Sequence, residues 1–295
     1  MSESLRPDVL QLGVAKINNL EIDVTVLERI DSTNDWSLGQ CRLGRVLPFA
    51  CFAESQTAGK GRRGKQWLMA ARANIATSVS WPFNLSRQPL HLLPLSIALA
   101  VVKTLEAFDL QEVQIKWPND IYVQGRKVAG ILIETQRLKQ KKTGNAIIRN
   151  QSENGGLSAV VIGVGLNYDM SAMPLVGDSE TETAEMLFNM TDISSEIKRQ
   201  SIDQVVERES VAAKLLQNIV SVCQSFQQNS PQMLAEFCAS YDFCKGKTVD
   251  VLLDNQSVLR GVAQGVNERA ELIVMVDGEN RIFNSAEVSV QAELK

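Results

Sequence analysis

Short apolar runs that end in turn residues recur along this chain and alternate with a few long segments of helical spacing. Residues 24–30, 49–53 and 74–81 are rich in β-branched or alternating apolar residues and are predicted strands. Between residues 90 and 108, apolar side chains recur every three or four positions, which predicts a largely buried helix. A chain built this way must fold with helices packed on a sheet.

The last fifty residues have a different character. Four short β runs follow one another, and Asp277-Gly278 between the last two is a strong hairpin signal. We therefore predict a small β barrel as a second domain, with boundaries at 1–242 and 243–295. Between the two parts, the pattern predicts strands at 113–117 and 158–166, a hairpin at 124–126, and helices at 211–226 and from Pro231 to Cys238.

Composition excludes several classes of protein. The apolar runs are too short to cross a bilayer, and the amino terminus lacks the basic and apolar regions of a secretory signal, so we expect a cytoplasmic protein with no membrane partner. Five scattered cysteines favour reduced thiols over disulfides or a zinc site. With a single histidine, His91, and a net charge of -4, we expect neither histidine-based covalent catalysis nor a dedicated nucleic-acid binder.

One stretch, AGKGRRGKQW at residues 58–67, gathers cations and glycines. Its glycines let backbone amides approach an anion, and arginine offers a forked donor that fits phosphate or carboxylate. It is not a Walker loop, because Gln66 stands where that motif has a serine or threonine after its lysine. Spacing alone leaves three interpretations open: an anionic ligand, a solvated charge run, or a local patch for nucleic-acid phosphates.

Two further segments could meet a ligand. Lys116 lies next to Trp117 in KWPND at a predicted strand end, although Trp117 could equally be core and Lys116 its partly buried neighbour. The segment IGVGLN at 162–167 places two glycines in an apolar strand, which indicates close approach of a ligand or of another backbone. Residues 135–157 are polar and basic, and are predicted to be a surface loop.

Taken together, DSTN at 31–34, ESQTAGKGRRGKQW at 54–67, KWPND with KVAGILIE at 116–134, and IGVGLN resemble biotin protein ligases in order and spacing. The resemblance covers about residues 20–292. It implies an α+β fold: a mixed β-sheet catalytic domain packed with helices, like the class II synthetases, and a C-terminal SH3-like β barrel. It also implies formation of biotinyl-5′-AMP from biotin and Mg-ATP, followed by transfer of biotin to a lysine of the biotin carboxyl carrier protein of acetyl-CoA carboxylase.

The resemblance also implies roles for particular residues. Ser32, Thr33 and Gln56 correspond to partners of the biotin ureido ring. Arg62 corresponds to a residue facing the biotin carboxylate and the α-phosphate, and Lys116 to one that neutralises charge in the transition state. The catalytic candidates are thus Lys116 and Arg62, with no protein metal site. The full set of candidate substrate-binding residues is Ser32, Thr33, Asn34, Gln56, Gly59, Lys60, Gly61, Arg62, Arg63, Lys116, Asn119, Gly130, Gly163, Gly165 and Asn167.

Some features depart from the family pattern. Lys60 stands where many relatives have arginine, and residues 168–200 lack the tryptophan that often packs near adenine. Fewer than 25 residues precede the catalytic region, so we expect no DNA-binding winged helix. The alternatives are a lipoate-type ligase or a non-catalytic biotin-sensing regulator, and a homodimer is possible because such ligases often self-associate.

Overall fold

The computed structural model describes residues 3–18, 20–85, 90–138, 157–172, 189–253, 257–285 and 288–292. The chain forms two compact units. The first unit contains Met1–Leu90, Ile131–Pro174 and Glu207–Cys223, and the second contains His91–Gly130, Leu175–Val206 and Gln224–Lys295. Strand β6 (Arg126–Arg137) and helix α6 (Arg208–Glu236) each run through both units.

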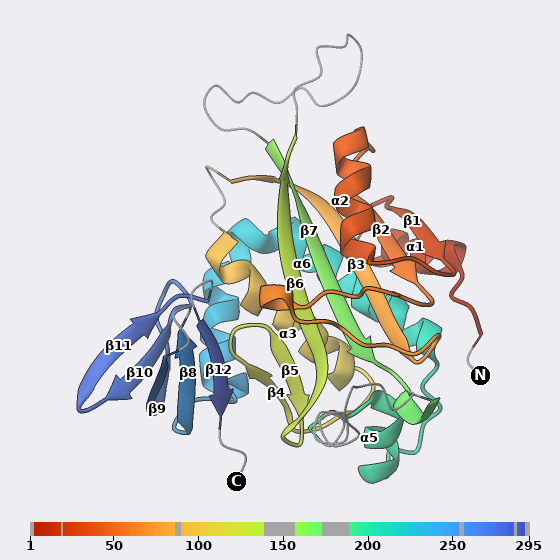
Figure 1. Ribbon diagram of the computed structural model, residues 1–295. Coiled ribbons are helices and arrows are strands. Elements are labelled where there is room, and N and C mark those ends of the chain that lie inside the picture. Colours follow the sequence, from red (N-terminus) through yellow and green to blue (C-terminus); the bar gives the residue numbers. More distant parts are fainter. Residues whose placement is uncertain are drawn as a thin grey trace. The chain divides into compact units, whose positions relative to one another are not determined.

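The first unit is built on strands in the order β1-β2-β3-β7-β6 (Figure 1). Strands β1 and β2 are parallel, whereas β2 with β3 and β3 with β7 are antiparallel, so the sheet is mixed. All five residues of β2 are buried, and so are most residues of β3 and β7, which is expected of strands covered on both faces. The bounds are β1 Asp23–Leu27, β2 Phe49–Ala53, β3 Asn74–Asn84 and β7 Leu157–Asn167.

Helix α2 (Thr33–Leu43) packs on β2, β3 and β7 (Figure 1). It begins at the N-cap Ser32, whose side chain accepts a hydrogen bond from the backbone N–H of Asp35, and it ends at Gly44, whose φ of 85° suits glycine. Leu38 and Cys41 of α2 form a buried cluster with Phe49 and β7 side chains. This packing fixes the helix start, where several candidate residues lie.

A buried ion pair joins separate segments of the first unit. Arg208, at the start of α6, lies 2.7 Å from the carboxylate of Glu54, and the two side chains are 2% and 1% exposed. Arg208 also donates to the carbonyls of Asn74 and Glu3, while Glu54 accepts from the backbone N–H of Leu5. The pair thus connects α6, the end of β2, the start of β3 and the amino-terminal segment before α1 (Pro7–Asn18).

In the second unit, β6, β5 and β4 pair in that order, and neighbouring strands are antiparallel. Strands β4 (Val113–Lys116) and β5 (Asp120–Val123) are joined by a turn with a cis Trp117–Pro118 bond, and helix α3 (Leu93–Glu106) packs on both. The hairpin after β5 turns at Gln124 and Gly125, both with positive φ, in agreement with the predicted hairpin. The apolar spacing that predicted α3 therefore describes its buried face.

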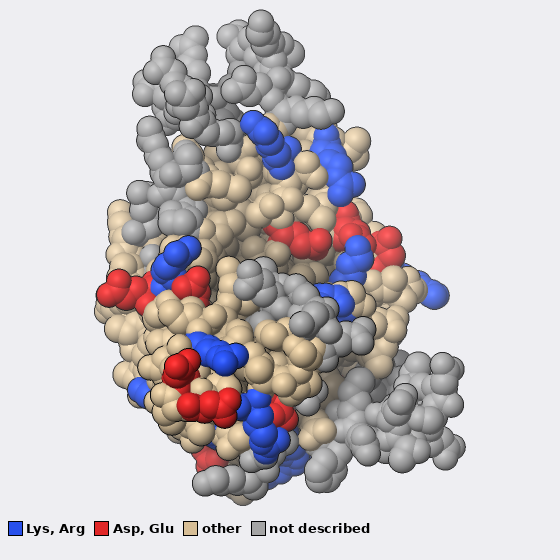
Figure 2. Space-filling view, turned by 60° about the vertical axis from the view of Figure 1, so that its left-hand side comes forward, with Lys and Arg blue, Asp and Glu red and all other residues tan. Residues whose placement is uncertain are grey.

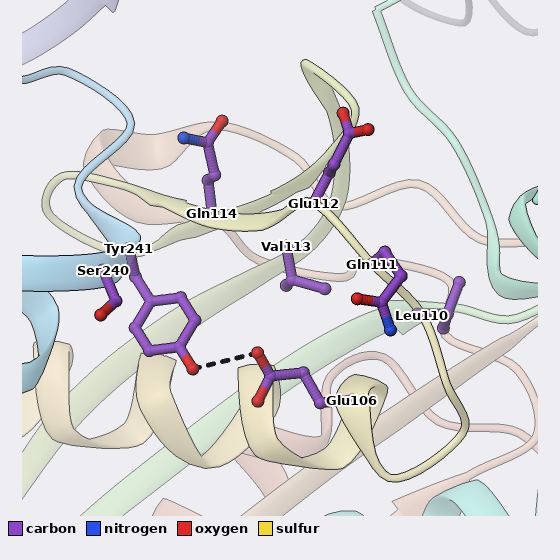
Figure 3. Close-up of a pocket in the computed structure, with 8 residues that line it drawn as sticks. All are labelled: Glu106, Leu110, Gln111, Glu112, Val113, Gln114, Ser240 and Tyr241. Carbon is purple, nitrogen blue, oxygen red and sulfur yellow. Dashed lines mark hydrogen bonds between the residues drawn. The ribbon is translucent and has the colours of Figure 1, made fainter.

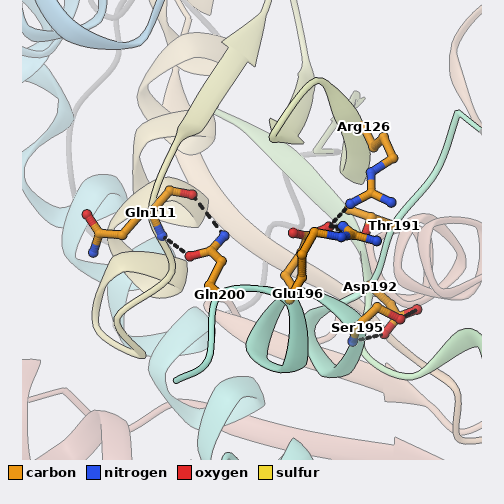
Figure 4. A network of polar contacts seen from close by, with 8 residues as sticks. Gln111, Arg126, Thr191, Asp192, Ser195, Glu196 and Gln200 are labelled. Carbon is orange, nitrogen blue, oxygen red and sulfur yellow. Dashed lines mark hydrogen bonds and ion pairs between the residues drawn. The ribbon is translucent and has the colours of Figure 1, made fainter. Parts of the chain in front are cut away.

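A polar network holds α5 (Ile193–Arg199) in place (Figure 4). The fully buried carboxylate of Glu196 accepts from Arg126, at 2.6 Å, and also from Thr191 and Arg199. Gln200 exchanges two hydrogen bonds with the backbone of Gln111. All three donors meet the same carboxylate oxygen of Glu196, and two of them are arginines that balance its charge, so the network has the character of structural support.

The carboxy-terminal part forms an antiparallel sheet in the order β11-β10-β9-β8-β12. Its strands are β8 Thr248–Leu253, β9 Val258–Val266, β10 Leu272–Val276, β11 Glu279–Phe283 and β12 Val288–Ala292. A mixed sheet with packed helices followed by a small antiparallel β domain confirms the predicted fold class. In the described part of the chain, no helix combines the length and apolar character needed to cross a membrane.

The prediction of a separate helix from Pro231 to Cys238 was wrong. Helix α6 runs without a break from Arg208 to Glu236 with Pro231 inside it, followed by a π-helical turn at Phe237–Tyr241. A proline costs an interior helix one hydrogen bond, but tertiary packing can outweigh that loss. The predicted surface loop at 135–157 lies mostly outside the described residues, and the short 3-10 turns are Arg62–Gly64, Leu90–Leu92 and Met170–Ala172.

Candidate functional site

A cluster of buried polar side chains lies at the start of α2 in the first unit. Ser32, Thr33 and Asn34 are 1%, 4% and 4% exposed. Thr33 donates to the side-chain oxygen of Gln56 twice, from its backbone N–H at 2.8 Å and from its hydroxyl at 3.2 Å. The helix start and the residue following β2 are thereby held together, as expected if both serve one polar site.

Ser78 and Glu134 complete this cluster, and the sequence interpretation did not single out either of them. The hydroxyl of Ser78 lies 2.6 Å from the side-chain oxygen of Asn34 and 2.8 Å from the hydroxyl of Thr33. The amide nitrogen of Asn34 donates to Glu134 at 2.9 Å and to the carbonyl of Leu132 at 3.3 Å. The sequence offered one signal for each residue. Ser78 is a polar residue within a predicted strand, and Glu134 is the acidic residue that ends KVAGILIE.

The cationic stretch 58–67 forms a small hairpin in the first unit. The backbone N–H of Gly61 donates to the carbonyl of Lys65 at 2.7 Å, and that of Trp67 donates to the carbonyl of Gly59 at 2.9 Å. The backbone conformation of the stretch is therefore set by its own hydrogen bonds. We call it the cationic hairpin.

The cations of the cationic hairpin differ in environment. Lys60 forms a 2.6 Å ion pair with Asp35 of α2, and this hydrogen bond raises the pKa of the lysine. Arg62 is half-buried, whereas Arg63 is exposed and has a φ of 56°. Arg62 is therefore less exposed than Lys60, Arg63 and Lys65.

Three glycines of the predicted site lie against side chains. A Cβ at Gly163 would come within 2.2 Å of the Asn34 side chain, and one at Gly165 within 2.4 Å of the Trp67 ring. A Cβ at Gly59 would meet the Trp67 carbonyl at 2.5 Å. The sequence predicted close approach of a ligand or of another backbone at Gly163 and Gly165, whereas in this structure side chains lie over both glycines.

Asn167 is separate from the buried polar cluster. It is fully buried, and its side-chain oxygen accepts from the amide of Asn74 at 2.7 Å across the β3 and β7 pair. The carbonyl of the same Asn74 accepts from Arg208. Asn167 therefore has a structural partner here, and its predicted contact with substrate stays a prediction.

The remaining candidates lie in the second unit, around the β4 and β5 turn. The ammonium group of Lys116 donates to the hydroxyl of Tyr122 at 3.4 Å. Asp120 pairs with Gly130 in the sheet and forms a 2.7 Å ion pair with Lys127. Asn119 lies in the same turn, next to the cis peptide. The pairing of β4, β5 and β6 places Lys116, Asp120 and Gly130 side by side on three neighbouring strands.

The second unit also contains a cavity of about 360 Å³ (Figure 3). None of the predicted site residues lines it. Tyr241 donates to the carboxylate of Glu106 at 3.0 Å there, and burial together with this hydrogen bond raises the pKa of Tyr241 to about 12. The other lining residues are Leu110, Gln111, Glu112, Val113, Gln114 and Ser240.

Surface charges do not form a continuous basic area on the face shown in Figure 2, where Lys and Arg lie among Asp and Glu. Within the described residues, no group of three or more His, Cys, Asp or Glu side chains gathers as a metal site would require. The cations of interest are thus those of the cationic hairpin and the β4 and β5 turn.

Comparison with known proteins agrees with this arrangement. A sequence model of the biotin/lipoate A/B protein ligase family matches residues 26–167, a range that contains both groups of candidate residues. The chain is 28% identical to the bifunctional ligase/repressor BirA of Escherichia coli (strain K12), over 98% of this chain and 81% of that protein. It is 26% identical to the biotin--[acetyl-CoA-carboxylase] ligase of Mycobacterium tuberculosis, over 89% of this chain and 87% of that one.

The fold is also similar to that of a solved ligase. The structure of biotin protein ligase from Aquifex aeolicus in complex with biotin and ATP aligns with a TM-score of 0.68 and 22% identity, covering 92% of this chain and 99% of that chain. The fold, the motif order and the near full-length similarity agree with one another. Residues 26–167 of this chain therefore form a biotin/lipoate A/B protein ligase domain.

Proposed function

We propose that this protein is an ATP-dependent biotin protein ligase. In the first step, the biotin carboxylate attacks the α-phosphorus of ATP, forming biotinyl-5′-AMP and releasing pyrophosphate. In the second, a lysine amine of a carrier protein attacks the carbonyl carbon and releases AMP. The observation that carries the proposal is the polar cluster of buried Thr33 and Asn34 and partly buried Gln56, in the same unit as the cationic hairpin.

The polar cluster has donors suited to a neutral cyclic urea. The side-chain oxygen of Gln56 is occupied by Thr33, whereas the partner that the structure gives its nitrogen is the sulfur of Met69 at 3.6 Å, a weak acceptor. A ligand carbonyl is a better acceptor than a thioether. We assign the ureido ring of biotin to Ser32, Thr33 and Gln56 on this basis.

The charged residues are suited to the anionic part of the reaction. Arg62 offers a forked guanidinium for the biotin carboxylate and the α-phosphate, and the cationic hairpin would screen the mixed anhydride from water. Lys116 would neutralise charge that grows on the reacting groups, which lowers the barrier without a protein nucleophile. Mg²⁺ would enter as part of the substrate Mg-ATP, held mainly by phosphate oxygens.

Partners and compartment follow from the same proposal. The names of relatives such as the Mycobacterium tuberculosis ligase support a biotin carboxyl carrier protein of acetyl-CoA carboxylase as the acceptor. The cytoplasm is the proposed compartment, and the five free cysteines support it. A homodimer remains part of the proposal.

Biotin-dependent exchange of pyrophosphate into ATP tests the function directly. Purified protein should catalyse exchange with biotin and not with lipoate, and should then label a carrier domain at one lysine. A biotin-sensing regulator would bind biotin without exchange, and a lipoate ligase would exchange with lipoate; either result would refute the proposal.

The same assay tests Lys116. Lys116→Met should lower the exchange rate at least tenfold while biotin affinity measured by calorimetry stays within about twofold, since a transition-state interaction is lost. Lys103→Met provides the control, because Lys103 is an exposed lysine of α3 paired with Glu236. Equal activity of the two variants would exclude Lys116 from catalysis.

A further inference from the structure

Lys116 stands beside a pair of stacked aromatic rings. Tyr122 and Phe243 have ring centroids 4.9 Å apart and an angle of 25° between their planes. The ammonium of Lys116 lies 3.4 Å from the Tyr122 hydroxyl and 5.4 Å from its ring centroid, so it is at the hydroxyl edge of the pair. The ammonium of Lys247 lies 3.3 Å from the centroid of Phe243. Two lysines that are far apart in the sequence, Lys116 and Lys247, therefore contact the same aromatic pair.

The distances fix the order in which the two lysines and the two aromatic rings stack. Because Tyr122 covers one face of the Phe243 ring, an ammonium 3.3 Å from the centroid of that ring lies over the other face. Lys247 therefore holds Phe243 against Tyr122 through a cation–π contact. The sequence along the stack is Lys247, Phe243, Tyr122, Lys116.

The backbone on both sides of Lys116 is held by the carboxy-terminal part of the chain. The carbonyl of Ile115 accepts from the backbone N–H of Phe243 at 3.0 Å. Trp117, which is 2% exposed, donates from its indole nitrogen to the carbonyl of Ala270 at 2.8 Å. Lys116 lies between these two anchored residues, so the freedom that remains is mainly that of its side chain.

Burial favours the neutral form of the Tyr122 phenol. Burial, followed by the nearby Asp120 carboxylate, raises the pKa of Tyr122 well above its usual range. The phenol oxygen therefore stays a neutral acceptor for the ammonium of Lys116 at every pH at which the enzyme would work. A neutral acceptor orients the cation without cancelling its charge.

We propose that Tyr122, Phe243 and Lys247 are positioning residues that aim the ammonium of Lys116 at the reacting phosphate. This inference rests on the proposed function. It assigns the carboxy-terminal β domain a part in adenylation: Lys247 acts through the two rings and touches no substrate. Loss of its charge would loosen Phe243, then Tyr122, and would leave Lys116 free to sample unproductive rotamers.

Substitutions at Lys247 separate positioning from folding. Lys247→Met keeps the length of the side chain and removes its charge, and should lower kcat of biotin-dependent ATP–pyrophosphate exchange roughly three- to tenfold, with KM for ATP within about twofold. Lys247→Arg keeps a cation over the ring and should restore the rate. Lys245→Met is the matched control, because Lys245 is an exposed lysine two residues away, and it should match the parent.

Tyr122→Phe tests the other end of the stack. It keeps the ring and removes the hydroxyl that accepts from Lys116, so it should lower kcat by a similar factor without changing biotin affinity. A Lys247→Met enzyme indistinguishable from Lys245→Met, or one with higher KM for ATP and unchanged kcat, would overturn the proposal. No exchange by the parent protein would instead refute the proposed function.

Discussion

At the scale of single residues, the two glycines of β7 make room for the side chains of Asn34 and Trp67. Gly163 faces Asn34 of the polar cluster, and Gly165 faces the ring of Trp67, the last residue of the cationic hairpin. A side chain at either position would displace one of them. Sequence alone indicated close approach of a ligand or of another backbone, and did not indicate the two side chains that lie there.

Gly165→Val is expected to destabilise the protein by about 1–3 kcal/mol, because its Cβ would lie 2.4 Å from the Trp67 ring and the strand cannot yield. Urea unfolding with tryptophan fluorescence measures this change. Gly39→Ala provides the opposite control: nothing lies within 4 Å of a Cβ there, and alanine should stabilise α2 by about 0.5–1 kcal/mol. Two variants with equal stability would mean that Trp67 moves freely away from β7.

Arg62→Gly should let the activated intermediate escape. The half-buried guanidinium is the group proposed to hold the carboxylate and the α-phosphate, so its loss should leave exchange measurable while biotin labels lysines of unrelated proteins. Labelling of serum albumin beside a carrier domain measures this. The control is Arg72→Gly, an arginine at φ 60° paired with Glu28, which should label the carrier alone. Carrier-only labelling by Arg62→Gly would argue against a screening role for the hairpin.

Asp242 gives the protein an unusual pH dependence. One carboxylate oxygen accepts from the backbone N–H groups of Cys244 and Lys245, while the other is buried without a hydrogen-bond partner among the described residues. Burial raises the pKa of Asp242 above its ordinary value of about 3.9. The pKa of Asp242 is thus higher in the folded protein than in the unfolded chain. Its contribution to stability is therefore fully present at low pH and is lost as pH rises through the folded pKa.

Asp242→Asn should therefore be more stable than the parent at pH 7, and its advantage should shrink as pH falls to 4 and below. The amide keeps an oxygen for the two backbone donors. Thermal unfolding from pH 3.5 to 7.5 measures the effect. Asp277→Asn, at the exposed turn between β10 and β11, should follow the parent. A constant difference across this pH range would show that the carboxyl does not titrate as its burial requires.

At the scale of elements, Arg208 connects pieces of the first unit that no local signal joins. Breaking a buried pair by removing one partner leaves an uncompensated charge and typically costs about 3–5 kcal/mol. Arg208→Met should lose about that much stability because Glu54 would stay buried. Arg72→Met, which breaks an exposed pair with Glu28, should cost less than about 1 kcal/mol. Urea unfolding distinguishes the two, and similar losses would contradict the importance of burial.

Local pattern was enough to predict most elements. Strands β2 and β4 and helix α3 fall close to the predicted ranges, because each has an apolar pattern that matches its burial. Helix α1 was not predicted, and α6 was divided at Pro231, because packing against the rest of the chain decides both. The strand order β1-β2-β3-β7-β6 could not be derived from spacing, since it depends on crossover connections.

The site was predictable to a similar extent. The motifs of the family resemblance indicated Thr33, Asn34 and Gln56, and the structure brings these residues together. Their contact with a substrate stays a prediction. The motifs could not indicate Ser78, whose partner lies 44 residues away in sequence. Nor could they link Tyr122 to Phe243, since this contact depends on the tertiary fold.

At the scale of the whole molecule, the proposed boundary between residues 242 and 243 cuts through the second unit. That unit joins His91–Gly130 with Gln224–Lys295. Phe243 donates to Ile115 and stacks on Tyr122, and Trp117 donates to Ala270. These contacts couple the β4 and β5 turn to the carboxy-terminal sheet.

A chain ending at Asp242 should therefore fold only in part. Without residues 243–295, β4 and β5 lose their anchors and the side chain of Trp117, now 2% exposed, would meet water. Amide hydrogen exchange followed by mass spectrometry should show protection lost at 113–123 and retained at β2 and β3, whose partners β1 and β7 belong to the first unit. Equal protection at 113–123 in the short and full chains would contradict this coupling. It would mean that β4 and β5 keep their structure, and Lys116 its place, without the carboxy-terminal β domain.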